Sequence, residues 1–351
     1  MSTPAAHELT LQEMNFDPPC WPEEALRAIA AEHFGIHGRC QPLPGERDQN
    51  ARISTAGGDD FVLKISSARA RPEVVDFHAQ ALLHIAAHDA GLPVPRMVPL
   101  SNGGVIVPIH SATGVHQVRM LTWLPGVCYQ DGVAPTRRGL RAVGAFLARL
   151  DQALQNFQHP AAGYWMPWDV TNGLIFKPQL QGMLSARVRT MLKPVWLRLE
   201  QQVYPQLAGL RRQVIHQDAH AANLLRLTPD DEAVAGLIDF GDMVHGPLIC
   251  ELAVTIADFL NVHADPLRVM VPICEGFHSL IPLAGAEIAI LLDLVIARLI
   301  LTLQLFEFRR RHMAQPPDFV TRDQPGIIAA LEALLALDGE VFTMATGEAC
   351  R

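Results

Sequence analysis

The sequence predicts an α+β protein with two lobes: a small N-terminal lobe with an antiparallel β-sheet and a helix, and a larger, mainly helical C-terminal lobe. Between residues 39 and 124, short runs of alternating apolar and polar residues are separated by glycine-containing turns, which is typical of antiparallel strands. From Pro135 onward, apolar residues recur mostly at helical spacing. A length of 351 residues is sufficient for two such lobes.

The composition is that of an ordinary globular protein. Apolar residues make up 49% of the chain and charged residues 18%, and the net charge is −8. An acidic protein is a poor partner for nucleic acid and is better suited to a cationic substrate. The six cysteines form no C-x-x-C pair, and the first 14 residues contain acids and no apolar segment. We therefore expect a reduced, cytoplasmic protein with no nucleic-acid partner; the sequence does not indicate its oligomeric state.

The most apolar region, 281–306, predicts a buried helix and not a membrane-spanning segment, so no membrane partner is expected. Glu287, Asp293 and Arg298 interrupt it. Charged residues inside a membrane span are costly and rare, so a buried helix is expected here.

Residues 1–21 are expected to be an extended N-terminal arm, and residues 22–124 the small lobe. A helix is predicted to start at Pro22, because acids occupy its first turn, and to end near Gly35. A second helix is predicted over 71–90, where it ends close to a glycine and two prolines.

The strands of the small lobe are predicted from alternation and turn residues. Residues 39–65 predict a β-meander, in which strands 51–55 and 61–65 flank the turn Gly57-Gly58. A second group of strands is expected around a turn at 101–104, and a Pro-Gly pair then ends the lobe.

Residues 125–351 are expected to form the large lobe. The segment 136–155 predicts an amphipathic helix. A helix over 184–204 is expected to kink near Pro194. Another helix begins close to Glu251, whose place in the first turn is explained most simply by a helix-cap role.

The stretch 214–246 contains the residues with the clearest chemistry. Asp218 follows one short apolar run, Asn223 comes five residues later, and Asp239 ends a second apolar run before Phe-Gly. Two carboxylates a few ångströms apart repel by roughly 4 kcal/mol at an effective dielectric of about 20, unless a cation lies between them. An amide oxygen beside them completes an all-oxygen site suited to Mg²⁺ and phosphate oxygens. The pattern H-x-D-x-x-x-x-N followed by D-F-G is the phosphoryl-transfer arrangement of kinases.

Further motifs surround this stretch and run in one order between residues 22 and 335. They are Leu43-Pro44 with Asp48-Gln49-Asn50, 61–65 (FVLKI), 119–126 (RMLTWLPG), Trp168-Asp169 and 238–243 (IDFGDM). With them the chain resembles the aminoglycoside phosphotransferase and choline kinase family of the protein-kinase-like fold. Within that family it most resembles the hydroxylysine kinases.

The resemblance implies catalytic and metal-binding roles in the large lobe. Asp218 would accept or orient the proton of the acceptor hydroxyl. His216, in the same loop, is expected to support the backbone near Asp239 instead of carrying a proton. Asn223 and Asp239 would hold Mg²⁺, which bridges the nucleotide phosphates. The resemblance also implies that an acid at the position of Glu251 braces the catalytic core, beside the simpler helix-cap role.

The resemblance also implies a nucleotide site in the small lobe. Lys64 would contact the α- and β-phosphates, and Gln49 and Asn50 would belong to a turn over the phosphates, although a solvated loop is equally consistent with these residues. Backbone groups around Leu121 and Trp123 would contact the purine edge. Backbone readout leaves no side-chain signature, so both ATP and GTP stay open; hydroxylysine kinases use GTP.

The acceptor implied by the resemblance is 5-hydroxy-L-lysine. Asp242, Trp168 and Asp169 would form part of its pocket, with the acids attracting ammonium groups. Simpler roles stay open, since Asp242 can cap a loop and the other two can pack the lobes together. Homoserine, choline, ethanolamine and aminoglycosides are also cationic alcohols, and the sequence does not choose among them.

Two positions depart from the usual pattern. In the helix over 71–90, His78 stands where kinases place the glutamate that pairs with the strand lysine, and Gln217 replaces a glycine of the catalytic loop. A nucleotide-binding pseudokinase therefore stays open as an alternative.

A zinc or di-metal hydrolase is a further alternative. Its candidate ligands are His216, Asp218, His220 and His245. Against it, Asn223 and the D-F-G turn would have no role.

Overall fold

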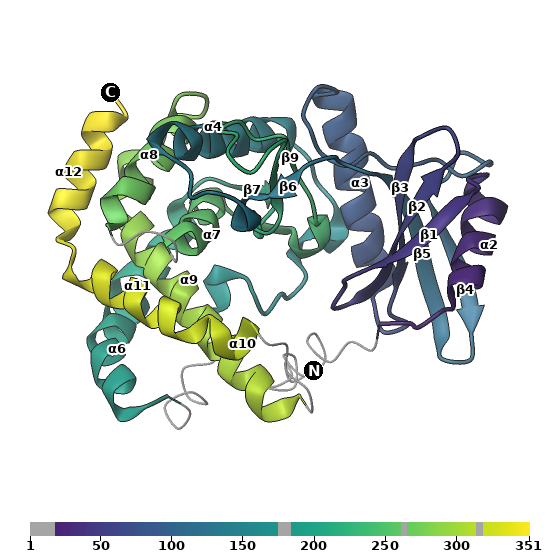
Figure 1. The fold of residues 1–351 in the computed structure, drawn as a ribbon. Helices are drawn as coiled ribbons and strands as arrows, with labels where there is room; N and C mark the ends of the chain where they lie inside the picture. Colours follow the sequence, from purple (N-terminus) through teal and green to yellow (C-terminus); the bar gives the residue numbers. More distant parts are fainter. Residues whose placement is uncertain (1–17, 175–183, 261–264, 314–318) are drawn as a thin grey trace.

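The structure is a computed structural model that describes residues 18–174, 184–260, 265–313 and 319–351. It has the two lobes that the sequence predicts, with the sheet lobe on the right of Figure 1 and the helical lobe on the left. Most of the expected N-terminal arm lies outside the described residues.

The small lobe is built on a five-stranded antiparallel sheet with the order β1-β2-β3-β5-β4. Its strands are β1 (Gly38–Leu43), β2 (Asp48–Thr55), β3 (Asp60–Ser66), β4 (Ile106–Ser111) and β5 (Gly114–Thr122). Successive side chains of a strand point to opposite faces. One face packs Ile53, Leu63 and Met120 against helix α2 (Glu23–Phe34), on the outer side of the molecule (Figure 1). The other face carries Lys64 and Arg119, which are cross-strand partners.

One hairpin was predicted correctly and one was not. Gly58, in the turn between β2 and β3, has φ of 92°, a conformation that glycine adopts without strain. The turn between β4 and β5 lies at residues 112–113 instead of 101–104. There the Ser111 hydroxyl accepts a hydrogen bond from the N–H of Thr113 (3.1 Å). The Asn-Gly-Gly turn at 101–104 instead precedes β4.

Helix α3 (Pro72–His88) lies between the sheet and the large lobe (Figure 1). Its apolar side chains, among them Phe77, Leu82 and Ile85, are buried in the core of the large lobe. The helix therefore joins the two lobes and directs His78 toward the space between them.

The large lobe contains α4 (Arg137–Ala153), α6 (Ala186–Arg198), α7 (Ile249–Phe259), α8 (Pro266–His278), α9 (Gly285–His312), α10 (Phe319–Arg322), α11 (Gln324–Ala336) and α12 (Gly339–Ala349). Helices α4 and α8 approach closely through two glycines. A Cβ on Gly144 would lie 1.9 Å from the carbonyl oxygen of Ile273, and a Cβ on Gly276 would lie 2.0 Å from that of Arg141. This crossing therefore requires glycine on both helices.

Helix α9 is long and apolar enough to cross a membrane by length and composition. However, 83% of its apolar window is buried inside the fold, as expected for a core helix. Helix α6 continues through Pro194 and passes into a π-helical turn at Leu199–Val203, so the kink near Pro194 stays a prediction.

Two small sheets hold the 214–246 stretch. Strand β7 (Arg212–Ile215) pairs with β10 (Val244–Pro247), and β8 (Leu224–Arg226) lies between β6 (Val127–Cys128) and β9 (Gly236–Leu237). The residues predicted for catalysis therefore all lie in the turns next to these strands.

Candidate active site

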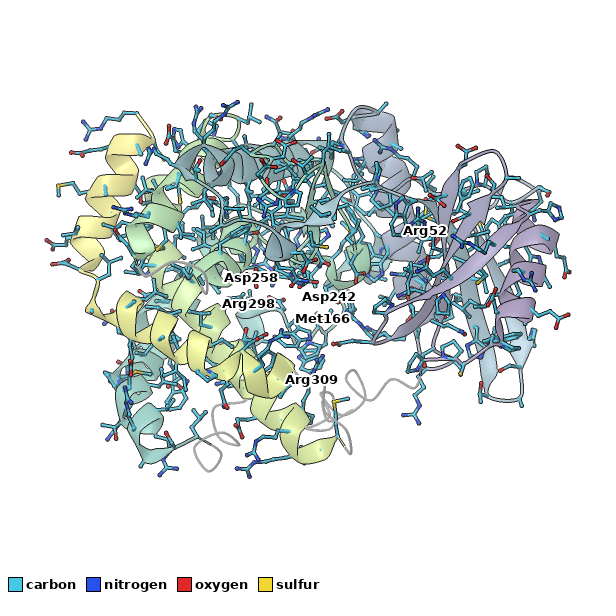
Figure 2. The ribbon with its side chains drawn as sticks, in the orientation of Figure 1. Arg52, Met166, Asp242, Asp258, Arg298 and Arg309 are labelled. Atoms are coloured by element: carbon cyan, nitrogen blue, oxygen red, sulfur yellow. The ribbon has the colours of Figure 1, made fainter. Side chains whose placement is uncertain are left out.

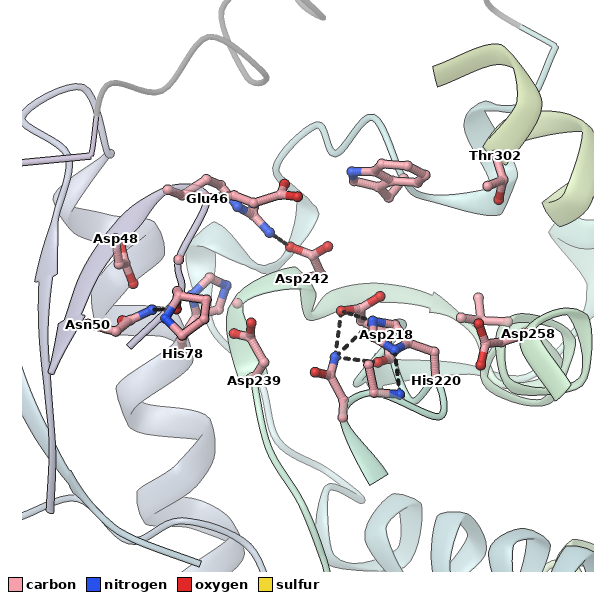
Figure 3. A pocket seen from close by; sticks show the side chains of 18 of the residues that line it. Glu46, Asp48, Asn50, His78, Asp218, His220, Asp239, Asp242, Asp258 and Thr302 are labelled. Atoms are coloured by element: carbon pink, nitrogen blue, oxygen red, sulfur yellow. Dashed lines mark hydrogen bonds and ion pairs between the residues drawn. The ribbon is translucent and has the colours of Figure 1, made fainter. Parts of the chain in front are cut away.

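A cavity of about 1050 Å³ lies between the two lobes, and it contains most of the predicted site residues. From the small lobe come Asn50 and Lys64, and from the large lobe come Asp218, Asn223, Asp239, Asp242 and Trp168. Figure 3 shows several of these side chains directed into the same space. Gln49, His216, Leu121, Trp123 and Asp169 do not line it.

The strand lysine reaches the acids of the large lobe. Nζ of Lys64 lies 3.5 Å from Oδ1 of Asp239 and 3.7 Å from Oδ2 of Asp48. The positive charge of Lys64 is the main cause that lowers the pKa of Asp239, so this carboxyl is ionised at neutral pH. Asp239 has φ of 61°, a strained conformation for an aspartate, which directs its side chain from the turn toward Lys64.

Asp218 and Asn223 form a second part of the site. Nδ2 of Asn223 donates to Oδ2 of Asp218 (2.8 Å) and to its backbone carbonyl (2.9 Å). Burial alone would raise the pKa of Asp218, but the charges of His220 and Arg298 outweigh it and lower the pKa. His220 lies 3.4 Å from the same carboxylate (Figure 3), whose charge contributes to raising the pKa of His220 to about 9 despite burial.

The donor atoms of Asn223 and Asp239 fit a magnesium–nucleotide complex. Because Nδ2 of Asn223 is committed to Asp218, its Oδ1 is the atom available as a ligand. The Asp239 side chain is 53% exposed and lines the same cavity. Two protein oxygen ligands plus phosphate oxygens are typical of Mg²⁺ sites that bind nucleotides.

The zinc-hydrolase alternative finds no support in the described residues. Among them, no group of three or more His, Cys, Asp or Glu side chains is arranged to hold a metal ion. His245 is exposed on β10 and does not line the cavity.

Glu251 braces the catalytic loop from helix α7. Its Oε2 accepts hydrogen bonds from the backbone N–H groups of His216 (2.7 Å) and Gln217 (3.1 Å). The simpler helix-cap role was therefore the wrong choice, because the carboxylate binds a loop 35 residues earlier in the chain. Gln217 adopts φ of 66°, so its backbone has the left-handed conformation that a glycine would supply.

His216 supports the same loop. Its Nδ1 accepts a hydrogen bond from the N–H of Asp218 (3.2 Å), and its ring packs edge-on against Phe240 at 4.6 Å. Burial lowers its pKa to about 4, so the ring is neutral at physiological pH. These contacts agree with a structural role for His216.

The two residues expected over the phosphates lie on opposite faces of β2. The Gln49 side chain accepts from the N–H of Trp21 and donates to its carbonyl, both at 2.8 Å, so it faces away from the cavity. Asn50 is the cross-strand partner of Lys64 and lines the cavity, where its Nδ2 donates to the carbonyl of Pro44 (2.9 Å). Strand alternation separates the pair, so the expected phosphate contact of Gln49 is wrong.

The predicted purine-reading groups are partly committed elsewhere. The N–H of Trp123 donates to the carbonyl of Asp60 (3.0 Å), and the guanidinium of Arg52 lies 4.2 Å from the centre of the Trp123 ring. Leu121 pairs with Val62 of β3. The Trp123 N–H is therefore not available to a purine in this arrangement.

The three predicted acceptor-site residues differ in position. Asp242 is buried, forms an ion pair with Arg47 of the small lobe, and lines the cavity. Trp168 also lines the cavity, and the guanidinium groups of Arg298 and Arg309 each lie 5.2 Å from the centre of its ring. Asp169 does not: its Oδ1 accepts from the N–H of Thr171 (2.9 Å) and caps a short helical turn, and burial raises its pKa.

Several charged residues of this site were not predicted. Arg298 of α9 donates from Nη1 to the carbonyl of Trp168 (2.5 Å) and lies 3.9 Å from Asp218. Arg309, also on α9, pairs with Glu46 of the small lobe (2.7 Å), and Asp258 accepts from the N–H of Ala221 (2.8 Å). Figure 2 shows Asp242, Asp258, Arg298 and Arg309 on the large-lobe side of the cavity.

The sequence signal for these residues was their position in apolar helices. An ionisable side chain inside an otherwise apolar helix must be paired or face a polar site.

Comparison with known proteins agrees with this geometry. The sequence profile of the phosphotransferase enzyme family matches residues 39–278. Hydroxylysine kinase of Mus musculus is 30% identical over 304 residues, which cover 80% of each chain. Hydroxylysine kinase of Danio rerio is 29% identical over 279 residues, 76% of this chain and 78% of the relative.

Solved structures show the same fold. An amicoumacin kinase in complex with AMP-PNP and Ca²⁺ has a TM-score of 0.68 at 17% identity, covering 96% of this chain and 99% of the other. A microcompartment-associated aminopropanol kinase has a TM-score of 0.69 at 18% identity, covering 88% and 95%. With the profile match over more than half of its length, the chain belongs to the phosphotransferase enzyme family and is a small-molecule kinase.

Proposed function

We propose that this kinase transfers the γ-phosphoryl group of GTP or ATP to the hydroxyl of 5-hydroxy-L-lysine. The observation that supports it most directly is the convergence of Lys64, Asp239 and the Asp218–Asn223 pair on one cavity, joined to the similarity with hydroxylysine kinases over about four fifths of the chain. The cytoplasm is the location we propose.

Asp218 is the group we place next to the acceptor hydroxyl. It is ionised, and Asn223 holds its carboxylate in one orientation. A carboxylate is a weak base toward an alcohol, so the larger effect is the alignment of the hydroxyl with the phosphorus atom. Lys64 holds the phosphates of the nucleotide from the small lobe. Asn223 and Asp239 would hold a magnesium ion, which would supply positive charge next to the phosphates when bound.

The acceptor side of the cavity suits a cationic alcohol. Asp218, Asp242 and Asp258 line it. Asp242 is paired with Arg47, and Arg298 lies 3.9 Å from Asp218. An ammonium group would therefore share these carboxylates with the two arginines. Carboxylates at this depth attract an ammonium group strongly, because water screens them less than at the surface. 5-Hydroxy-L-lysine carries two ammonium groups, whereas ethanolamine and homoserine carry one.

The pseudokinase alternative is based on Gln217 and His78, and the structure weakens both arguments. Gln217 adopts the backbone conformation of the glycine that it replaces. Lys64 has a carboxylate neighbour in the small lobe even though α3 offers His78. We therefore favour an active enzyme.

The test is a nucleotide-consumption assay with GTP and ATP against a panel of amino alcohols. The panel contains 5-hydroxy-L-lysine, homoserine, choline, ethanolamine and an aminoglycoside. We expect the largest kcat/KM with 5-hydroxy-L-lysine. A larger value with another acceptor would replace this substrate, and nucleotide binding without transfer to any of them would favour a pseudokinase.

Asp218→Asn provides the mechanistic control. We expect it to lower kcat by roughly 10²- to 10⁴-fold while the protein stays folded. Asp230→Asn, the same change in an exposed loop, should leave kcat unchanged. Comparable rates in the Asp218 variant and the wild type would remove this residue from the mechanism.

A further inference from the structure

The acid that orients the strand lysine in protein kinases comes from the helix beside the sheet. In this protein the equivalent helix, α3, presents His78 to the cavity. The side chain is buried, and both burial and the charges of Arg119, Arg47 and Lys64 lower its pKa. A neutral imidazole cannot act as the counter-ion of an ammonium group, so Lys64 needs another partner.

Asp48, at the start of β2, has the right position. Asn50, two residues after Asp48 on β2, is the cross-strand partner of Lys64 on β3. Asp48 is therefore diagonally opposite Lys64 and on the same face of the sheet. Its Oδ2 lies 3.7 Å from Nζ of Lys64. Figure 3 shows Asp48, Asn50 and His78 on the small-lobe side of the cavity, with Asp239 opposite.

Asp48 is itself fixed by a second cation. Nη2 of Arg119 donates to the same Oδ2 at 2.7 Å, and Arg119 is directly opposite Lys64 across the β3–β5 ladder. Like charges directly opposite each other destabilise a sheet, and a carboxylate between them removes the repulsion. The Asp48 side chain is only 16% exposed, so solvent screens these attractions weakly.

Asp239 is the other carboxylate within ion-pair distance of Lys64 among the described residues, but it cannot replace Asp48 as an anchor. It belongs to the opposite lobe, is half exposed, and is one of the two residues proposed to hold the metal ion. We propose that Asp48 is the positioning residue that holds Lys64 toward the nucleotide phosphates. Without it, Lys64 is attracted toward Asp239 and away from Arg119.

The inference depends on nucleotide binding and not on the identity of the acceptor. Asp48→Asn keeps the size of the side chain and an acceptor for Arg119, and it removes the charge. We expect kcat/KM for the nucleotide to fall roughly 10- to 100-fold, while KM for the acceptor stays within about twofold. The increase in Tm that the nucleotide causes in the absence of metal should also become smaller. Asp59→Asn, an exposed aspartate in the β2–β3 turn, is the matched control and should behave as wild type.

A rescue variant separates positioning from a structural role. Asp48→Asn combined with His78→Glu moves the carboxylate from β2 to α3, where His78 already faces the cavity. We expect the double variant to recover most of the lost nucleotide kcat/KM. A loss of Tm alone, with unchanged nucleotide kinetics and no effect of His78→Glu, would overturn the proposal.

Two further measurements keep the test decisive. If Asp48→Asn does not fold, Asp48→Glu retains the charge but moves the carboxylate by one methylene group; we expect a severalfold rise in nucleotide KM, and unchanged kinetics would overturn the proposal. If no acceptor of the panel is phosphorylated, the proposed substrate fails, whereas the metal-free Tm shift still decides the role of Asp48.

Discussion

Glu251→Gln should reduce the change in unfolding free energy between low and neutral pH. The wild-type carboxyl is fully buried and accepts two backbone N–H groups of the catalytic loop, from His216 and Gln217. The amide oxygen of glutamine can accept the same two hydrogen bonds, but it carries no charge at any pH. The substitution therefore removes the ionisation of this site while it preserves its hydrogen bonds.

The size of the effect follows from the pKa of Glu251. Burial, with a smaller contribution from the charge of Asp218, raises this pKa from 4.5 to about 7 against the lowering effect of the two N–H groups. Because the folded-state pKa is the higher one, the contribution of Glu251 to stability is complete below pH 4.5 and is lost as the pH rises through about 7. The difference corresponds to roughly 3 kcal/mol of unfolding free energy. Burial, together with Glu251, also raises the pKa of nearby Asp151, which strengthens the trend in the wild type.

Chemical denaturation at pH 5 and pH 8, followed by tryptophan fluorescence, measures this change. Wild type should lose more unfolding free energy between the two pH values than Glu251→Gln, by up to roughly 3 kcal/mol. Glu24→Gln, at an exposed position in α2, controls for the loss of one acid. Parallel pH profiles for wild type and Glu251→Gln would refute the reasoning, because Glu251 would then ionise alike in the folded and unfolded chains.

Two further predictions concern the loop at residues 44–47 and strand β2. Arg309→Gln and Glu46→Gln should each raise the acceptor KM by a few-fold, because their ion pair ties this loop to α9 across the cavity. Glu46 is half exposed, so a double-mutant cycle on kcat/KM should give a coupling energy below about 1 kcal/mol; additive effects would mean that the pair does not act together. Gln49→Ala should lower the free energy of unfolding by about 1–2 kcal/mol without changing the nucleotide KM, since its amide binds the backbone of Trp21. Asn50→Ala should raise the nucleotide KM. A raised nucleotide KM in Gln49→Ala together with an unchanged one in Asn50→Ala would contradict the placement of the two residues on opposite faces of β2.

The convergence of the residues proposed for catalysis could be expected from the sequence, because it depends on short strands and the turns next to them. Each of Asp218, Asn223 and Asp239 lies in a turn next to a short strand, and these strands pair in two small sheets. Their side chains need only a few residues of regular structure to come together. Alternation and a glycine turn predicted the hairpin of β2 and β3 in the same way, but not the turn between β4 and β5.

Gln49 was predicted to lie over the phosphates together with Asn50, but its side chain is on the opposite face of the sheet. Alternation along β3 correctly places Lys64 and Val62 on one face. A strand paired in register with β3 must also alternate, so only one of Gln49 and Asn50 can face Lys64. The contact of Gln49 with Trp21 is a tertiary contact 28 residues away, and no local pattern indicates it.

Glu251 and Arg298 required a different kind of inference. Both are ionisable residues in helices whose other side chains are almost all buried, and the cost of burying an unpaired charge means that each must have a partner. The sequence shows that such partners must exist but not where they lie, because they depend on how α7 and α9 pack against the catalytic loop. The partners of Glu251 are in that loop, namely the backbone N–H groups of His216 and Gln217. Arg298 has one partner there, Asp218, and a second in the carbonyl of Trp168. A charged residue in a buried helix is thus evidence that the helix packs against a polar site. The sequence motif identifies only the residues of the loop, and such charged residues identify the helices beside it.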